Sequence, residues 1–138
     1  MALSLLHERL VLDTSAYSRL CSGHDAVLDT VSAAGVTLIP ATVLGELEAG
    51  FSLGSRPREN RLRLAEFLAE PFVRAIDTTA ATARHYGALF AHLRSAGTPV
   101  PINDVWIAAA TLERGGHLLT FDSHFSLMAE LSCTVLEA

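Results

Sequence analysis

The chain has 138 residues, of which 50% are hydrophobic and 18% charged, with a formal net charge of −5. This composition predicts a single globular domain over residues 1–138 and excludes a disordered chain. The acidic balance is not the usual footprint of a nucleic-acid-binding protein, and no apolar run approaches the ~20 residues that a membrane span needs.

Two features favour a cytoplasmic location. The segment Met1–Arg9 has neither a basic flank nor a long apolar stretch, so we expect no signal peptide. The two cysteines, Cys21 and Cys133, form no CxxC pair, and we expect both to be reduced thiols.

The first third of the chain alternates short apolar runs with helix patterns. A strand is predicted at 9–12, followed by the turn Asp13–Ser15, whose polar side chains can cap the next helix. That helix is predicted at 26–34, ended by glycine, and a second strand follows at 36–39.

Two further helices and a strand are predicted in the middle of the chain. The first helix covers 42–49 and is ended by Gly50. The second opens at 55–58, with Leu62, Leu64, Ala65 and Leu68 on one side. A third strand is predicted at 72–76.

The last third repeats the alternation. Asp77 and Thr78 are predicted to cap a long helix over 79–96, and a stiff proline-containing loop follows it. A helix at 103–114 precedes strands at 117–120 and 134–136. Strands that alternate with helices predict an α/β fold: a short, mostly parallel sheet of about five strands between two helical layers.

Four acidic residues stand where strands end or helices begin: Asp13, Glu46, Asp104 and Asp122. Because the carboxyl ends of parallel strands meet at one edge of a sheet, we expect their carboxylates to converge in one crevice. Two carboxylates about 5 Å apart repel each other by roughly 3 kcal/mol at an effective dielectric constant of about 20. Such a cluster therefore needs a proton, an arginine or a metal ion nearby.

A divalent ion that prefers oxygen ligands, Mg²⁺ or Mn²⁺, is the simplest resolution, and zinc is disfavoured because no His or Cys ligand is required. Such a site predicts hydrolysis of a phosphodiester by a metal-activated water. Four polar residues flank the acids and can orient ligands or water: Thr14, Ser15, Asn103 and Thr120. Taken singly, each acid has an ordinary alternative as a helix cap, a turn former or a solvated charge.

Other polar residues carry weaker signals. All ten basic residues are arginine, and four of them cluster at Arg56, Arg58, Arg61 and Arg63. Such a run is usually a solvated helix face, although arginine also suits phosphate contacts. We therefore consider Arg56, Arg58 and Arg61 as candidate contacts for RNA or a partner protein. A further candidate contact is His124, which lies near Asp122.

Four segments in order, at 12–16, 42–50, 99–109 and 119–125, resemble the PIN-domain ribonucleases, and the chain is most similar to the VapC toxins of type II toxin–antitoxin systems. The resemblance implies an α/β/α sandwich, Mg²⁺- or Mn²⁺-dependent RNA cleavage, a homodimer, and a small antitoxin that blocks the site. DNA would be contacted only through that antitoxin.

By motif, the resemblance makes Asp13, Glu46, Asp104 and Asp122 the catalytic metal site. Thr14, Ser15 and Thr120 correspond to polar positions beside it. One position departs from the pattern, because many relatives carry an aspartate just before the last phenylalanine, where this chain has His124.

Two other functions fit the same residues: an RNA-processing PIN nuclease without an antitoxin, or a catalytically silent dimeric partner in a DNA-bound complex. A phosphatase with an aspartate nucleophile is disfavoured. Position 15, two residues after Asp13, is serine, and the chain has no lysine to hold a phospho-enzyme.

Overall fold

The computed structural model describes residues 7–138 and contains a sheet in the order β3-β2-β1-β4-β5, in which every pairing is parallel. The predicted fold class and strand number are therefore confirmed. The strands are β1 (Arg9–Leu12), β2 (Val36–Pro40), β3 (Val73–Ile76), β4 (His117–Thr120) and β5 (Cys133–Val135).

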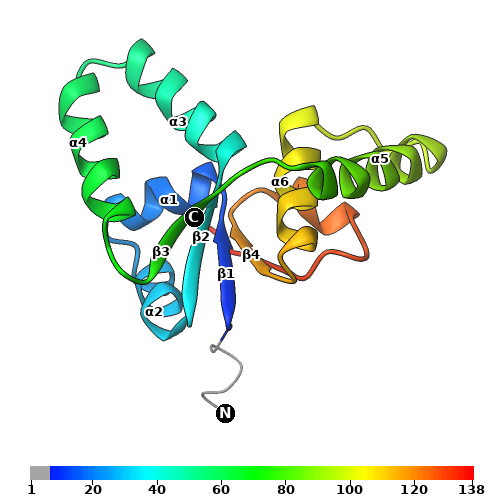
Figure 1. The fold of residues 1–138 in the computed structure, drawn as a ribbon, viewed down its shortest axis with the longest axis horizontal. Helices are drawn as coiled ribbons and strands as arrows, with labels where there is room; N and C mark the ends of the chain where they lie inside the picture. The colour runs from blue at the N-terminus through cyan, green and yellow to red at the C-terminus, as the bar shows by residue number, and fades with distance from the viewer. Residues whose placement is uncertain (1–6) are drawn as a thin grey trace.

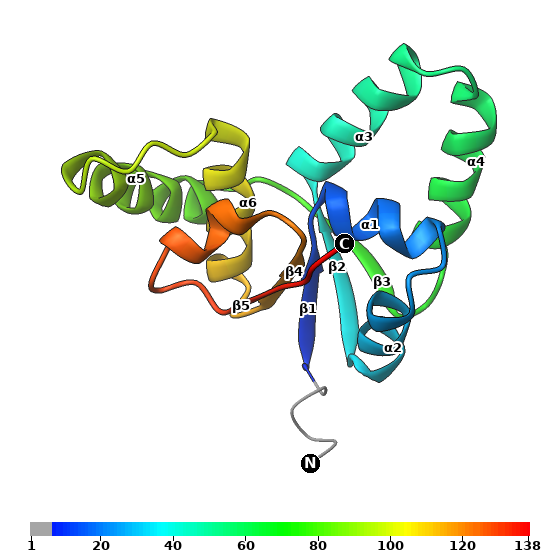
Figure 2. The ribbon, with the colours of Figure 1, turned by 180° about the vertical axis from the view of Figure 1, so that it is seen from behind.

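The helices form layers on both sides of this sheet. They are α1 (Thr14–Cys21), α2 (Asp25–Ala33), α3 (Ala41–Leu53), α4 (Pro57–Leu68), α5 (Ala80–Ser95), α6 (Ile102–Glu113) and the short 3-10 helix η2 (Ser123–Leu127). Figures 1 and 2 show α1, α2 and α4 on one side of the sheet and α5 and α6 on the other. This division follows from right-handed crossovers, because the chain builds the sheet outward from β1 to β3 and then returns to β4 and β5.

The direction of winding reverses between β1 and β4, which are neighbours in the sheet. At such a reversal, the connections leave the two strands on opposite faces and open a crevice at their carboxyl ends. Asp13 immediately follows β1, and Asp122 lies two residues after the end of β4. The topology thus places both residues at the usual ligand-binding position of an open α/β sheet.

The central strands are buried on both faces. Leu10, Val11 and Leu12 of β1 are fully buried, as is Leu118 of β4, while Leu119 is 1% exposed. A parallel strand covered on both sides requires this continuous apolar character, in contrast to the alternation of a half-exposed strand. The rigid core therefore extends to the residue before Asp13.

Two short helices were not predicted from the sequence. The turn Asp13–Ser15 leads directly into α1, for which Asp13 is the N-cap, and not into the later helix α2. The second is η2, which begins after Asp122, again as the capping residue. In both helices, the acidic side chain that caps the helix is also one of the four acids of the predicted site.

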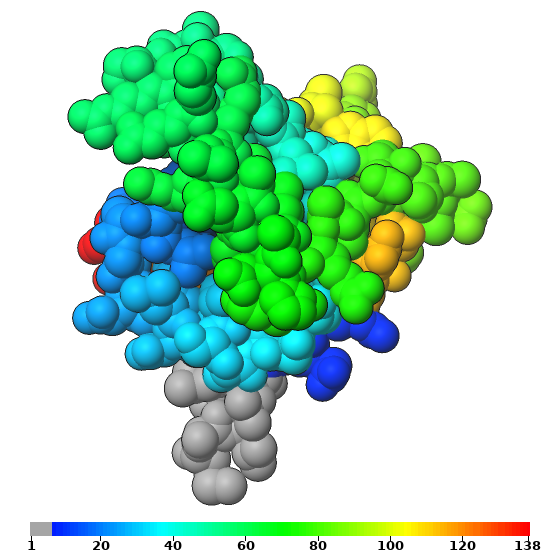
Figure 3. Space-filling model, turned by 60° about the vertical axis from the view of Figure 1, so that its left-hand side comes forward, coloured from blue at the N-terminus to red at the C-terminus, as the bar shows by residue number. Residues whose placement is uncertain are grey.

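Helix α3 continues past Gly50, which was predicted to end it, and reaches Leu53. Val43, Leu47 and Phe51 are spaced four residues apart, so they form one apolar stripe that packs on the core beyond the glycine. Helix α3 and α4 together form a hairpin that stands out from the body of the protein (Figure 3).

Two predictions for helices α4 and α5 also differ from the structure. On α4 only Leu64 is buried, and Leu62 is 61% exposed, so the predicted apolar side is narrower than expected. The cap of α5 is Thr79, in a capping box with Thr82, and not the predicted Asp77–Thr78 pair.

Among residues 7–138, no helix has the length and apolar character needed to cross a membrane. Most of the N-terminal segment in which we expected no signal peptide, residues 1–6, lies outside the described residues.

Gly35 begins the return of the chain from α2 to β2, and replacing it with alanine should destabilise the fold. A Cβ at this position would lie 2.7 Å from the carbonyl oxygen of Glu8, just before β1. We expect Gly35→Ala to lower the free energy of unfolding by about 1–3 kcal/mol, the usual cost of overpacking. Urea denaturation measures this change.

The matched control is Gly87→Ala in α5, where a Cβ would meet no atom within 4 Å. Alanine is the better helix former, so this variant should be stabilised by up to about 1 kcal/mol. Equal stability of Gly35→Ala and the wild type would contradict the close approach of the chain at Gly35.

Candidate functional site

Asp13 is the most firmly held of the four acids. It is 5% exposed, and its Oδ1 accepts hydrogen bonds from the Ala16 backbone N–H at 2.9 Å and from the Ser15 hydroxyl at 2.7 Å. Its Oδ2 accepts a hydrogen bond from the Thr120 hydroxyl at 2.5 Å. Both oxygens are therefore occupied, and the carboxylate cannot rotate without losing a bond.

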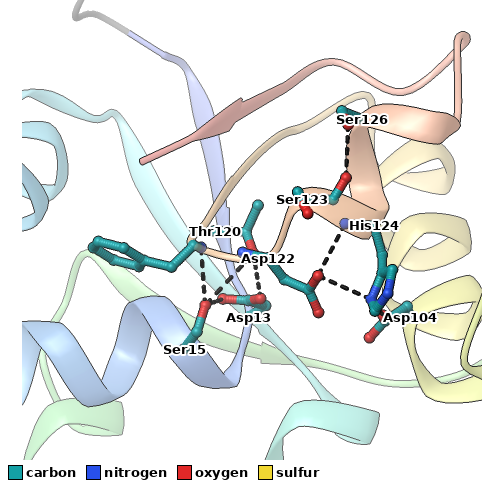
Figure 4. Close-up of polar contacts among 9 residues, drawn as sticks. Asp13, Ser15, Asp104, Thr120, Asp122, Ser123, His124 and Ser126 are labelled. Atoms are coloured by element: carbon teal, nitrogen blue, oxygen red, sulfur yellow. Dashed lines mark hydrogen bonds and ion pairs between the residues drawn. The ribbon is translucent and has the colours of Figure 1, made fainter. Parts of the chain in front are cut away.

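Hydroxyl groups tie the ends of β1 and β4 together (Figure 4). Thr120 Oγ1 donates to Asp13 and accepts from the backbone N–H of Asp122 at 2.9 Å. Ser15 Oγ also bridges the strands, because it donates to Asp13 and accepts from the Phe121 N–H at 3.0 Å. Ser15 and Thr120 thus contact Asp13 directly, and their role in orienting it stays a prediction.

The imidazole ring of His124 contacts both Asp104 and Asp122 (Figure 4). Nδ1 of His124 lies 2.9 Å from Asp122 Oδ1 and 3.5 Å from Asp104 Oδ2. Asp122 Oδ1 also accepts a hydrogen bond from the His124 backbone N–H at 2.9 Å, which fixes Asp122 as the cap of η2 and His124 in its first turn.

One oxygen of Asp104 has no hydrogen bond. Oδ2 is fully buried and finds no hydrogen-bond partner among the described residues, so its contact with His124 is electrostatic only. An unsatisfied buried oxygen costs about 1–3 kcal/mol, and more when it is charged. This atom is the clearest sign that the site is built for a further positively charged or hydrogen-donating group.

Glu46, in the second turn of α3, forms hydrogen bonds with residues of α1 and α6. Its Oε1 accepts a hydrogen bond from the Thr14 hydroxyl of α1 at 2.6 Å. Its Oε2 accepts one from the Asn103 side-chain amide of α6 at 3.3 Å. Thr14 and Asn103 thus each donate a hydrogen bond to Glu46, and their role in orienting it stays a prediction.

The pKa values record the mutual influence of the acids. The pKa of Asp104 rises from its usual 3.8 to about 6, first because of burial and then because of Asp122, Glu46 and Asp13; His124 opposes the rise. Burial also raises the pKa of Asp13, and Asp122 adds to this, while hydrogen bonds from Thr120, Ala16 and Ser15 oppose it. All four acids therefore share one electrostatic environment.

The acids are not equivalent as metal ligands. Asp104, Asp122 and His124 each offer a ligand atom, and these three atoms lie within 4.8 Å of one another. Asp13 and Glu46 belong to the same acidic cluster, but their oxygens are engaged by hydroxyl, amide and backbone donors. The donor set fits a divalent cation, because it is rich in carboxylate oxygens and contains the unsatisfied Asp104 Oδ2.

The arginine cluster is separate from these contacts. Arg61 forms an ion pair with Glu48 at 2.7 Å and a hydrogen bond to Ser52, which closes the α3–α4 hairpin. Arg56 lies 3.9 Å from Glu59, and Arg58 is exposed. None of the ion pairs found among the described residues joins Arg56, Arg58 or Arg61 to the four acids.

The place of His124 between two carboxylates was not predicted. Its spacing of two residues from Asp122 is the only sequence signal, and that spacing brings the side chains together only because η2 forms a tight turn after its cap.

Comparison with known proteins gives consistent matches. The sequence matches the PIN domain family over residues 10–131. Ribonuclease VapC5 of Mycobacterium tuberculosis is 32% identical over 120 residues, which is 86% of this chain and 86% of that protein.

Solved structures extend the likeness to the whole fold. VapBC-5 from Mycobacterium tuberculosis, a member of the VapBC family of toxin–antitoxin systems, aligns with a TM-score of 0.72 at 27% identity, covering 95% of this chain and 99% of that chain. VapBC2 from Rickettsia felis, bound to a promoter DNA fragment, aligns with a TM-score of 0.82 at 23% identity, covering 94% and 99%. At 23% identity, the second likeness concerns the fold alone.

Replacing Asp104 with asparagine should stabilise the metal-free protein, increasingly so at higher pH. The folded state raises the pKa of Asp104 from 3.8 to about 6, so it binds the proton more tightly than the unfolded chain does. Ionised Asp104 therefore lowers stability progressively between about pH 4 and 6, a penalty that asparagine lacks. In EDTA, Asp104→Asn should gain about 1–3 kcal/mol over the wild type at pH 7 and less at pH 5.

Urea denaturation at the two pH values measures the gap, and Asp77→Asn, at an exposed loop position, is the control that should show none. A gap that stays constant or shrinks as the pH rises would show that the Asp104 charge is not destabilising.

Proposed function

The chain belongs to the PIN domain family, and on this basis we propose that it is a metal-dependent endoribonuclease that acts as the toxin of a toxin–antitoxin pair. The observation that carries the proposal is the acidic cluster near the ends of β1 and β4, where Asp104 keeps an unsatisfied buried oxygen beside Asp122. The similarity to ribonuclease VapC5 supports RNA as the substrate. Residues 1–138 would form a single nuclease domain.

We propose that Asp13, Glu46, Asp104 and Asp122 form the site for Mg²⁺ or Mn²⁺. A divalent ion bound there would supply an activated water and offset the charge that develops on the phosphodiester. The carboxylates offer the hard oxygen ligands that such ions prefer, and neutralising their repulsion is part of the favourable energy of binding.

The residues around the acids act by positioning them. Thr120 and Ser15 each donate a hydrogen bond to Asp13, and Thr14 and Asn103 each donate one to Glu46, so both carboxylates are held in place before substrate arrives. Preorganised charges do not need to reorient during the reaction, which is the main source of electrostatic catalysis.

The acidic cluster is partly exposed to solvent at Asp122 and His124. The side chain of Asp122 is 36% exposed and that of His124 is 48% exposed, whereas Asp104 is nearly covered. A long polymer can therefore present one phosphodiester to the acids without threading through a closed pore. This openness suits cleavage within a chain.

We propose three partners for the protein: RNA, a small antitoxin and a second copy of the same chain. The solved VapBC-5 structure, from a toxin–antitoxin family, supports the antitoxin. The net charge of −5 supports contact with DNA only through that partner. Arg56 and Arg58 on the α3–α4 hairpin remain candidate contacts for RNA or the antitoxin, and Arg61 is engaged by Glu48.

Purified protein should cleave single-stranded RNA in Mg²⁺ or Mn²⁺ and stop when EDTA is added. Asp13→Asn and Asp104→Asn should each lower the rate by about 100-fold or more, because each removes a charge that the metal site requires. Cleavage is followed on gels, and circular dichroism checks the fold of each variant.

Glu48→Gln is the matched control, since Glu48 is an exposed carboxylate on the same helix as Glu46 but pairs with Arg61. It should cleave at a rate close to the wild type. Full activity of either aspartate variant would remove that residue from the site, and cleavage that survives EDTA would overturn the metal-dependent mechanism.

Expression of the chain alone in a bacterial host should arrest growth, and Asp13→Asn should relieve the arrest at equal protein level. Sequencing the 5′ ends of cellular RNA after brief induction identifies the cleaved RNA. New 5′ ends without growth arrest would favour an RNA-processing role. The absence of both in the wild type would favour a catalytically silent partner.

A further inference from the structure

His124 stands where an additional metal ligand would stand. Its Nδ1 lies 2.9 Å from Asp122 Oδ1 and 3.5 Å from Asp104 Oδ2. Adjacent ligands of an octahedral ion, each about 2.1 Å from the metal, are separated by about 3 Å. The two distances from Nδ1 are therefore close to the separation of neighbouring ligands, and the three ligand atoms all lie within 4.8 Å of one another.

The buried oxygen of Asp104 is an independent sign that a ligand is missing from this group. Asp104 is 9% exposed, and its Oδ2 faces His124 without accepting a hydrogen bond from any described residue. An ion pair with His124 alone leaves this atom unsatisfied, because the separation of 3.5 Å and its geometry do not make a hydrogen bond. A cation shared by the three residues would satisfy it.

The local backbone holds the imidazole in this position. Asp122 caps η2 by accepting the His124 N–H, so the two side chains leave the same tight turn and face Asp104 at the start of α6. The half-exposed side of His124 remains open to water and substrate. This arrangement leaves room for the remaining ligands of an ion.

We propose that Nδ1 of His124 is a direct ligand of the catalytic divalent ion, together with Asp104 Oδ2 and Asp122 Oδ1, and that it makes the site select a first-row transition ion such as Mn²⁺ over Mg²⁺. The inference rests on the proposed metal-dependent function and deepens it. Mg²⁺ strongly prefers oxygen ligands, whereas imidazole nitrogen binds transition ions well. One nitrogen ligand among carboxylates therefore favours binding of Mn²⁺ over Mg²⁺.

Pulsed electron paramagnetic resonance of the Mn²⁺-loaded protein tests the ligand directly, without an activity assay. The wild type should show coupling of the Mn²⁺ electron spin to an imidazole ¹⁴N nucleus. His124→Ala and His124→Gln should bind Mn²⁺ without that coupling. His92→Ala, at an exposed position on α5, is the control and should keep it.

Calorimetry with Mn²⁺ and Mg²⁺ measures the selection. The wild type should bind Mn²⁺ at least about tenfold more tightly than Mg²⁺, and both His124 variants should lose most of that preference. Their Mg²⁺ affinity should stay the same or increase, because the carboxylates remain and a competing partner is gone. Circular dichroism establishes that both variants are folded.

The outcomes separate this inference from the proposed function. If the wild type binds Mn²⁺ with no nitrogen coupling, or if the coupling persists in both His124 variants, His124 is not a ligand and the acidic site still stands. If the wild type binds neither Mn²⁺ nor Mg²⁺, the metal-dependent function fails and this inference fails with it.

Discussion

The repulsion between carboxylates gathered at one edge of the sheet is the constraint around which this protein is organised. Two such groups about 5 Å apart cost roughly 3 kcal/mol in a protein environment, and whole domains are stable by only about 5–15 kcal/mol. The reversal of winding between β1 and β4 forces Asp13 and Asp122 together, and the starts of α6 and α3 bring Asp104 and Glu46 to the same place. The buried strands beneath them supply the stability that makes this concentration of charge tolerable.

The protein manages the four acids in different ways. Asp13 accepts three hydrogen bonds and Glu46 accepts two, so these residues are fixed parts of the wall. Asp104 keeps a buried oxygen without a hydrogen bond, and burial, together with the nearby Asp122, raises its pKa to about 6. The unsatisfied charge is thus concentrated at one atom, where the proposed cation would offset it. Rigid walls around an unsatisfied centre are what a preorganised metal site requires.

The polar residues beside the acids form hydrogen bonds both to the carboxylates and between elements of the fold. Thr120 and Ser15 are part of the link between the ends of β1 and β4, and the same hydroxyls orient Asp13. Asn103 reaches from α6 to Glu46, so a shift of either helix would move a carboxylate. The geometry of the site therefore depends on correct packing of both helical layers. A change in packing elsewhere in either layer would shift the carboxylates.

The sequence by itself determined the order of the strands along the chain and their approximate bounds, and β2, β3 and β5 differ from the predicted ranges by one residue at one or both ends. The bounds of β1 and β4 were predicted without error, because the apolar runs at 10–12 and 118–119 are typical of strands covered on both faces. Only the tertiary structure decided where helices continue or end: α3 passes Gly50 because Phe51 finds a packing partner in the core. It also decided the place of His124, because the tight turn of η2 and the packing of α6 against β4 and η2 bring its ring between Asp104 and Asp122. Local sequence records which side chains can bind a cation, whereas their convergence is a property of strand order and helix packing, which no short segment contains.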